Sequence, residues 1–393
     1  MKLILISNYQ HGIGGINAQV DLLHTYLNQE EGIQADIFST KGNPLRRCIA
    51  FFLLLCKARR YDVLHIHACS YWGMVPAVFG VIAGKLWRKR IVITYHGGEA
   101  AEYFAKHVGF VKRWLGRANQ VIVLSGFLKE IFDQYDIPCM VIPNIVVLQP
   151  QQKRTRDIAP RFISIRHLEP LYNIPCILRA YEQVLKVYPE ATLDILGRGS
   201  QREELEAYVE EHQLTGVTFV GQVPNQQIYD YLIKADIMLS APKIDNMPVS
   251  LLEAMNAGLL VISSRVGGVP YMINEVKGER LKVKGIDECK VDSVKCKGEE
   301  NGKADTPASA PYTVHPTPTE SSRLIASSPY RPNKATGLLF ESDNADELAE
   351  KMIWALEHSE EVKQIIAQAQ VDVQKYAWKN VKQQLMKIYE QIR

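Results

Sequence analysis

The chain has 393 residues, of which 47% are hydrophobic and 23% are charged. This composition is that of a folded protein rather than a disordered or membrane-spanning one, and the length exceeds what one hydrophobic core usually holds. The formal net charge of +3 is too small to indicate nucleic acid as a partner. We therefore predict two folded domains and no nucleic-acid partner.

The N-terminus and the cysteines both favour a reduced, cytoplasmic location. MKLILISNYQHGIGG contains a short apolar run without a small-residue cleavage site, so we interpret it as a first buried strand rather than a signal peptide. The seven cysteines are scattered and form no CxxC pair, which excludes a zinc site of the usual spacing.

Short apolar runs alternate with helix-length amphipathic segments through most of the chain. In the first part the predicted strands are residues 3–6, 62–67, 91–95, 121–124 and 140–143. After a polar stretch the pattern restarts, and the predicted strands are residues 162–165, 192–196, 217–220, 237–239, 260–262 and 337–340. Because these runs are continuously apolar, we expect strands covered on both faces, in parallel sheets with helices on each side.

The pattern predicts an α/β protein with two Rossmann-like, doubly wound parallel-sheet domains that face each other across a cleft. The first domain is predicted at residues 1–150 and the second at 156–375, with a C-terminal helix at about 376–393 that packs back on the first. Residues 276–336 are rich first in charge and then in proline, serine and threonine. Such a segment buries too little apolar area to offset its chain entropy, so we predict a disordered surface insertion, with a partner-binding segment as the alternative.

Ligands of such sheets bind beyond the carboxyl ends of the strands, which directs attention to the loops there. HGIGGINAQ follows the first strand, and its Gly14 and Gly15 allow a close backbone approach beside a helix N-terminus, which suits a phosphate. A tight turn without a ligand is the alternative. TYHGGEA places His96 and Gly97 at another strand end, where a histidine can bond a sugar hydroxyl or be structural.

Two histidines, His65 and His67, lie on the buried strand DVLHIHACS. We interpret them as structural, with one of the pair facing the core. In the second half, ISIRHLEPLYN places Arg166 at a strand end facing the cleft, where its guanidinium suits a diphosphate. ILGRGS then places Gly197 and Arg198 in a turn that could wall a nucleotide base.

The stretch KIDNMPVSLLEAMNAGLL contains a polar loop, residues 245–248, that enters an apolar helix carrying Glu253 and ending at Gly258. We expect Asp245 or Asn246 to cap this helix. Taken alone, the stretch fits a well-capped core helix as well as it fits a ligand site.

Together these pieces resemble the retaining glycosyltransferases of family four, which have the GT-B fold and transfer a sugar from a nucleotide-diphosphate donor. The resemblance rests on GIGGI, YHGG, VIVLSGFLKE, VIPNIV, ISIRHLEP, ILGRGS, DNMPVSLLEAMNAGLLVISSRVGGVP and TGLLF, in this order. It covers nearly all of the chain except the insertion.

The resemblance implies roles for individual residues. Glu253 would bind the donor ribose, the 245–248 loop would approach the transferred sugar and the diphosphate, and His96 would contact the sugar. The family's acidic motif has a glutamate at its first position, where this chain has Asp245. The predicted catalytic residues are Arg166, Asp245, Glu253 and His96. The predicted substrate-binding residues are Gly14, Gly15, Gly97, Gly197, Arg198, Lys243, Asn246, Met247 and Pro248.

A second departure concerns the diphosphate. The family usually pairs its arginine with a lysine a few residues later, and HLEPLYN after Arg166 supplies none. Lys243 or Arg265 is our hypothesis for a substitute. The family is thought to use front-face attack, so we name no protein nucleophile. No D-x-D motif appears in a suitable loop, and we expect neither a metal nor another cofactor.

LRRCIAFFLLLCKARR, residues 45–60, has an apolar centre too short to span a bilayer and basic residues on both sides. It suits a helix lying on an anionic membrane surface, on the inner face, or a domain helix packed on the sheet with basic ends. The resemblance implies a sugar transferase acting on a glycan or lipid-linked acceptor, in cell-surface polysaccharide or glycolipid synthesis. The alternatives are another GT-B enzyme, such as a sugar-nucleotide epimerase, or an inactive sugar-nucleotide-binding scaffold.

Overall fold

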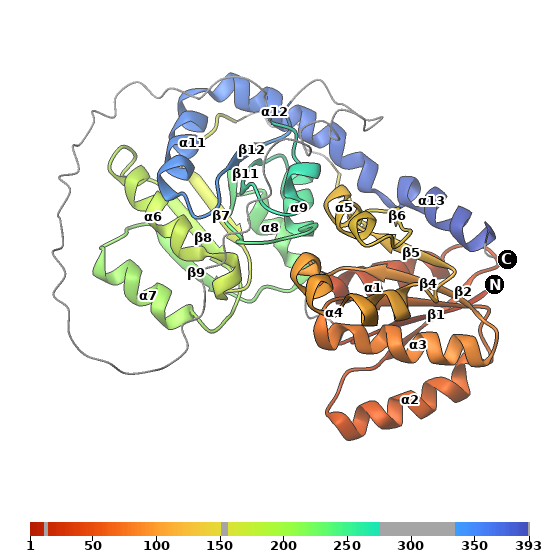
Figure 1. Cartoon of the computed structure of the whole chain (residues 1–393). Helices are drawn as coiled ribbons and strands as arrows, with labels where there is room; N and C mark the ends of the chain where they lie inside the picture. Colours follow the sequence, from red (N-terminus) through yellow and green to blue (C-terminus); the bar gives the residue numbers. More distant parts are fainter. Residues whose placement is uncertain (12–14, 151–155, 276–334, 392–393) are drawn as a thin grey trace, which may run out of the picture. The chain divides into compact units, whose positions relative to one another are not determined.

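The computed structural model describes residues 1–11, 15–150, 156–275 and 335–391. These residues contain two six-stranded sheets in which every paired strand is parallel (Figure 1). The prediction of an α/β fold with two doubly wound sheets is confirmed. The domain boundaries stay a prediction, because the described residues belong to one compact unit. The predicted insertion falls outside the described residues except at its last two positions.

The first sheet has the strand order β2-β1-β3-β4-β5-β6. Its strands are β1 (Lys2–Ser7), β2 (Gln34–Ser39), β3 (Val63–Ala68), β4 (Arg90–Tyr95), β5 (Gln120–Val123) and β6 (Met140–Val141). Five of them lie where apolar runs predict them. The edge strand β2, QADIFS, mixes polar and apolar residues and is only half-buried, so it escaped prediction.

The second sheet has the order β12-β11-β10-β7-β8-β9. Its strands are β7 (Arg161–Ile165), β8 (Thr192–Leu196), β9 (Val217–Gly221), β10 (Ile237–Ser240), β11 (Leu260–Ser264) and β12 (Leu338–Phe340), all close to their predicted positions. In both sheets the first strand is followed by strands added on one side of it and later by strands added on the other side. The change of side falls between β1 and β3 in the first sheet and between β7 and β10 in the second. These two places are the topological switch points of the fold.

Helices connect the strands of both sheets. Those of the first half are α1 (Gly15–Asn28), α2 (Pro44–Ala58), α3 (Val75–Leu86), α4 (Ala100–Leu115) and α5 (Gly126–Gln134). Those that follow are α6 (Ile174–Leu185), α7 (Arg202–Glu211), α8 (Ile228–Leu232), α9 (Val249–Ala257), α11 (Ala345–Glu357), α12 (Ser359–Asp372) and α13 (Trp378–Gln391). None of the helices in the described part of the chain combines the length and apolar character that crossing a bilayer requires.

Strand β1 shows why the apolar runs are continuous. Ile4 and Ile6 belong to the core that α3, α4 and α5 build on one face of the first sheet. Leu3 and Leu5 point the opposite way, into a core shared with α1 and α13. Helix α13, the last element of the chain, thus covers the face of the first sheet opposite α3 (Figure 1).

Candidate functional site

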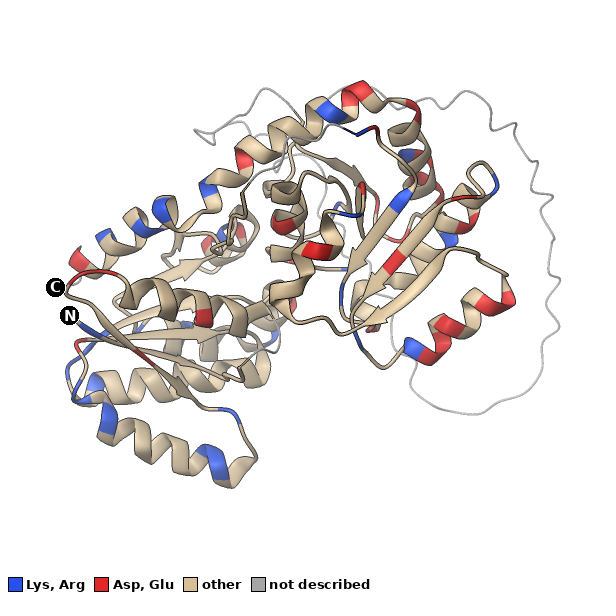
Figure 2. Ribbon diagram, turned by 180° about the vertical axis from the view of Figure 1, so that it is seen from behind, with Lys and Arg blue, Asp and Glu red and all other residues tan. Residues whose placement is uncertain are grey.

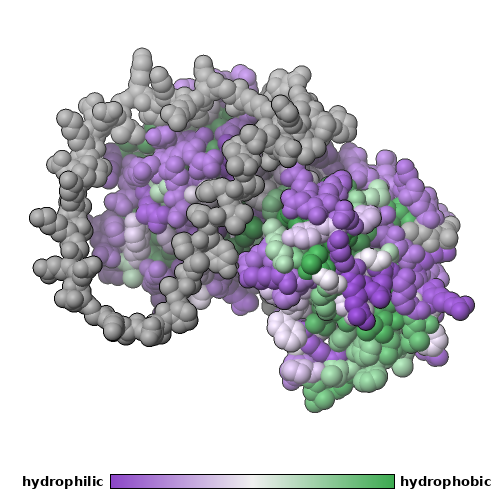
Figure 3. Space-filling view, viewed as in Figure 1, coloured by the Kyte–Doolittle hydropathy of each residue, from purple (hydrophilic) through white to green (hydrophobic). Residues whose placement is uncertain are grey.

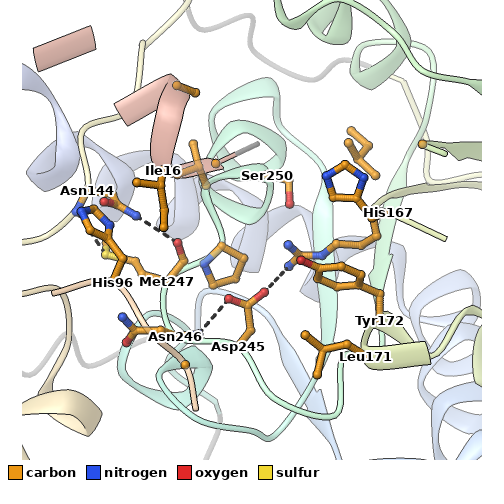
Figure 4. A pocket seen from close by; sticks show the side chains of 18 of the residues that line it. Ile16, His96, Asn144, His167, Leu171, Tyr172, Asp245, Asn246, Met247 and Ser250 are labelled. Atoms are coloured by element: carbon orange, nitrogen blue, oxygen red, sulfur yellow. Dashed lines mark hydrogen bonds and ion pairs between the residues drawn. The ribbon is translucent and has the colours of Figure 1, made fainter. Parts of the chain in front are cut away.

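A cavity of about 580 Å³ lies where the carboxyl ends of strands from both sheets meet. From the first sheet, the segments that follow β1, β3 and β4 line it, and from the second sheet those that follow β7, β8, β9 and β10. The start of α9 completes the wall, and Figure 4 shows side chains from these segments converging. Both topological switch points therefore open into one cavity, as the placement of ligands in such sheets leads us to expect.

Arg166 follows β7 directly and is nearly buried at the switch point of the second sheet. Its Nη2 lies 3.2 Å from Asp245 Oδ2, and it also donates to Ser240 Oγ at 3.2 Å. The ring of Tyr172 lies against the guanidinium, with Cζ 5.6 Å from the ring centroid. These contacts from three sides hold the cation in one orientation in the cavity wall.

Gly197 has a specific reason to be glycine at the end of β8. Its φ is +145°, and a Cβ built there would lie 1.8 Å from the carbonyl oxygen of Arg166. Only a residue without a side chain lets the two strand ends approach so closely. The turn ILGRGS therefore supports the backbone of Arg166 as well as lining the cavity.

Asp245 makes two interactions within the described residues that fix its carboxylate. Besides the ion pair with Arg166, its Oδ1 accepts a hydrogen bond from the backbone N–H of Asn246 at 2.7 Å. Helix α9 begins at Val249 with Pro248 as its flanking residue, and no side chain caps it. The predicted capping of α9 by Asp245 or Asn246 is therefore wrong, because both side chains are engaged elsewhere. The predicted end of the helix at Gly258, with φ +80°, is confirmed.

Glu253 of α9 lines the cavity, and its surroundings disfavour the ionised form of its carboxyl group. Burial raises its pKa from the usual 4.5 to about 7, and Arg166 only partly opposes this shift. No hydrogen bond joins its carboxylate to another residue in the described ranges. An acidic group in this state is poised to accept hydrogen bonds from hydroxyl groups that enter the cavity.

Three histidines form a row that runs from the buried strand β3 to the cavity, where His96 is only partly buried. His65 and His67 stack with ring centroids 4.8 Å apart, and His67 and His96 stack at 5.2 Å. Residues two apart on a strand share a face, so both histidines of β3 point into the layer under α13, which corrects the expectation that only one does. Burial lowers the pKa of all three, that of His96 to about 4, so all are neutral near pH 7.

The hydrogen bonds in this row select a tautomer for His96. His67 Nδ1 lies 2.9 Å from His96 Nε2, while His67 Nε2 is buried without a hydrogen-bond partner among the described residues. A buried N–H without an acceptor is rarer than a buried acceptor without a donor, so the proton of His67 belongs on Nδ1. His67 then donates to His96 Nε2, and His96 carries its own proton on Nδ1.

Two residues of the first half hold the 245–248 loop, and their roles were not foreseen from the sequence. Ser125 Oγ donates to Asn246 Oδ1 at 2.5 Å. Asn144, from the motif VIPNIV, donates from Nδ2 to the Met247 carbonyl oxygen at 3.2 Å, and Figure 4 shows this contact beside His96. Asn144 also lines the cavity. The motif VIPNIV could have marked Asn144 as a site residue, but its contact with Met247 could not be foreseen, because the two residues are 103 positions apart.

The cavity collects most of the predicted site residues. Those that line it are Gly15, His96, Gly97, Arg166, Gly197, Arg198, Asp245, Asn246, Met247, Pro248 and Glu253. Gly14 lies outside the described residues.

Neither of the two candidates for a substitute diphosphate cation, Lys243 and Arg265, lines the cavity, and the hypothesis stays a prediction. Lys243 is exposed and does not line the cavity, although the residues that follow it, Ile244 and Asp245, do. Arg265 is held by ion pairs to Glu275 and Glu341 and is likewise absent from the cavity wall. Arg198 is the second cation that the structure brings to the cavity. Within the described ranges, no group of three His, Cys, Asp or Glu residues has an arrangement that could hold a metal ion.

Comparison with known proteins places the chain in a family. A family model described as Glycosyltransferase Family 4 matches residues 30–149, and one described as Glycosyl transferases group 1 matches residues 148–288. The two matches are contiguous and together cover well over half of the chain.

Among curated relatives, phosphatidylinositol N-acetylglucosaminyltransferase subunits from several organisms are similar. The Arabidopsis thaliana protein is 28% identical over 34% of this chain and 31% of its own length. The Homo sapiens protein is 30% identical over 40% of this chain and 34% of its own length. The match thus spans about a third of these relatives. A glycogen synthase of Mycobacterium tuberculosis is 23% identical over 53% of each chain.

Solved structures show the same fold. Anabaena HepE in complex with UDP has a TM-score of 0.68 at 16% identity, and the match covers 100% of both chains. Sucrose-phosphate synthase from Thermosynechococcus elongatus has a TM-score of 0.70 at 18% identity, over 100% of this chain and 98% of that one. Two contiguous family matches and two parallel sheets of the GT-B type agree: the chain belongs to the glycosyltransferases of family four.

Proposed function

We propose that this protein is a retaining glycosyltransferase that moves a sugar from a nucleoside diphosphate sugar to a hydroxyl of a glycan or lipid-linked acceptor. The observation that carries the proposal is the convergence of Arg166 and Glu253 on one cavity at the switch point of the second sheet. A cation suits the diphosphate, and a carboxylate to which no described residue donates suits the ribose hydroxyls.

Departure of the nucleotide leaves negative charge on its diphosphate, and the oriented guanidinium of Arg166 stabilises that charge. Removing one such donor typically costs about 3–4 kcal/mol of barrier, or roughly 100- to 1000-fold in rate. The acceptor hydroxyl attacks the carbon from the face that the nucleotide leaves and passes its proton to the departing phosphate oxygen. No side chain is needed as a nucleophile. His96, neutral and carrying a proton on Nδ1, donates a hydrogen bond to the sugar.

Relatives support uracil as the donor base and a lipid-linked acceptor. HepE was solved with UDP and with UDP and glucose, and the pneumococcal O-GlcNAc transferase GtfA with UDP and GlcNAc. Two of the curated relatives named above belong to phosphatidylinositol N-acetylglucosaminyltransferase. We accordingly propose a UDP-sugar as donor and a lipid-linked or glycan acceptor of a cell-surface polysaccharide or glycolipid pathway.

The test begins with thermal unfolding in the presence of UDP-, GDP- and ADP-sugars. A donor at 100 times its dissociation constant stabilises the fold by roughly 2.7 kcal/mol, and we expect UDP-sugars to stabilise most. Donor hydrolysis and transfer are then measured with purified protein, with Glu253→Ala expected to abolish both. Glu210→Ala, at an exposed position on α7, is the matched control.

Other outcomes decide against the transferase. Binding without hydrolysis or transfer to any acceptor preparation would assign the chain as a sugar-nucleotide-binding scaffold. Conversion of one sugar nucleotide into another would assign an epimerase.

We also propose that transfer needs no divalent metal, because Arg166 and Arg198 supply positive charge at the cavity. The expected result is equal turnover before and after EDTA treatment. Loss of turnover that Mg²⁺ restores would contradict this.

A further inference from the structure

Helix α2 carries apolar residues on its inner and on its outer face, and local sequence signals fix where it begins. Asn43 caps it by accepting from the backbone N–H of Arg46 at 2.9 Å, and Pro44 occupies the first turn. Leu54 and Ala58 are fully buried, and the helix packs against α3. This inner face anchors α2 to the rest of the first half.

The outer face of α2 is apolar as well. Leu45, Ile49, Phe52 and Leu53 recur at helical spacing and are 70%, 51%, 65% and 51% exposed. A helix on the surface of a soluble domain normally presents polar residues there, because exposed apolar area is unfavourable in water. Figure 3 shows hydrophobic residues gathered at the lower right of the view, over α2 and α3.

The end of α3 extends this apolar surface. Trp87 Nε1 donates to the carbonyl oxygen of Leu55 at 2.7 Å, which fixes the end of α3 against the last turn of α2. Leu86 and Trp87 are themselves exposed. We define the α2 surface as Leu45, Ile49, Phe52, Leu53, Leu86 and Trp87.

The charges around the α2 surface have one sign. Residues 44–60 contain five Lys or Arg residues and no Asp or Glu, and residues 75–89 contain three and none. Figure 2 shows blue and no red on α2. An apolar strip bordered by cations is the arrangement of a helix that lies in the headgroup region of an anionic bilayer, with apolar side chains inserted and cations at the phosphates.

We propose that the α2 surface docks this protein onto an anionic lipid membrane, with α2 parallel to the bilayer plane. The helix has 15 residues, about 22 Å in length, which is shorter than the roughly 30 Å of a hydrocarbon core. A second copy of the chain is a poorer occupant. A two-fold interface through this surface would bring the cations of both copies together, and like charges oppose association. The docking surface is independent of the transfer reaction, since none of its residues lines the cavity.

The experiment is co-sedimentation of the full chain with vesicles of phosphatidylcholine alone and of phosphatidylcholine with 30% phosphatidylglycerol, about one anionic lipid in three. We expect binding to the anionic vesicles that weakens with added salt, and little binding to the neutral ones. Because Ile49, Phe52 and Leu53 are exposed, the triple change to Gln leaves the fold intact, and it should remove binding. Replacing Arg59 and Arg60 by Gln should weaken binding by about fivefold per charge.

Val371→Gln is the matched control, since Val371 is a 65% exposed apolar residue on α12, away from the α2 surface. Unfolding temperatures of all variants establish that each is folded. The proposal is overturned if the chain ignores anionic vesicles at low salt, or if the triple variant binds as the parent does. It is also overturned if the parent is a dimer that the triple variant dissociates, since the surface would then join two copies. Donor hydrolysis in the absence of vesicles should be the same for parent and triple variant, which separates this surface from the proposed function.

Discussion

At the scale of single residues, Glu253 shows how a site residue works against the stability of the fold. Its pKa is raised by burial to about 7, above the usual 4.5, so the folded protein binds a proton more tightly than the unfolded chain does. Stability therefore falls as the pH rises from about 4.5 to about 7, and the loss is complete above that range. Such a cost is typical of groups held ready for a ligand.

We predict that Glu253→Gln raises the free energy of unfolding at pH 8 by roughly 2–3 kcal/mol, because the amide avoids burying a negative charge. At pH 4, below the pKa of the unfolded chain, the carboxyl is mostly protonated in both the folded and the unfolded protein, and variant and parent should be nearly equally stable. Denaturant titrations at the two pH values measure this, with exposed Glu210→Gln as the control. Equal stabilities at pH 8 would show that the carboxylate is better solvated than its surroundings indicate.

His67 is a positioning residue in our interpretation, since it touches His96 rather than the space of the cavity. We predict that His67→Leu lowers kcat/KM for transfer by roughly five- to tenfold, the worth of one hydrogen bond. His67→Asn keeps a donor near the position of Nδ1 and should restore most of the rate. The ¹⁵N spectrum of His96 reports directly on its tautomer.

If His67 served only to fill the core, the result would differ. In that case His67→Leu would alter stability while the rate and the His96 tautomer stayed as in the parent.

At the scale of elements, the loop between β10 and α9 depends on contacts with the loop that follows β11. A Cβ on Gly268 would lie 1.8 Å from the carbonyl oxygen of Asn246, and one on Gly267 would lie 2.0 Å from that of Asp245. The two glycines of RVGGVP therefore let two loops pack backbone to backbone. Their motif was visible in the sequence, but its purpose becomes apparent only when both loops are placed.

We predict that Gly268→Ala destabilises the protein by about 1–3 kcal/mol and weakens donor binding, because the 245–248 loop must shift to make room. Gly109→Ala is a control, since Gly109 lies in α4 with no atom within 4 Å of its added Cβ. That substitution should raise helix stability by about 0.5–1 kcal/mol. Thermal unfolding and donor titration distinguish the two, and unchanged donor affinity in Gly268→Ala would contradict the proposed role of the loop.

At the scale of the whole molecule, the last helix completes the core of the first sheet. Leu385 of α13 is 3% exposed and lies in the same apolar cluster as Leu3 and Leu5 of β1. Tyr389 of the same helix bonds His65 Nδ1 at 2.6 Å. The end of the chain thus stabilises the layer in which the histidine row lies.

We predict that Leu385→Ala lowers the free energy of unfolding by about 2–5 kcal/mol, because it leaves a cavity against the first sheet. Gln384→Ala, at the exposed neighbouring position, should change stability little. Denaturant unfolding followed by circular dichroism measures both. A small effect of Leu385→Ala would mean that α13 contributes little to the fold.

The fold class and most of the loops that build the site could be predicted from the amino-acid sequence. Continuous apolar runs reflect burial on two faces, a local property, and the loops that follow them had to meet at the carboxyl edge of a parallel sheet. The edge strand β2 was missed because half-burial leaves no such run.

Which side chains reach the cavity became clear only from the three-dimensional arrangement. Lys243 and Arg265 lie near the right strand ends in sequence, yet one is exposed and the other is paired with acids. Asn144 reaches Met247 across 103 positions. The reason is physical: periodicity is encoded over a few residues, whereas a contact between distant loops depends on their backbone paths and on the packing that fixes them.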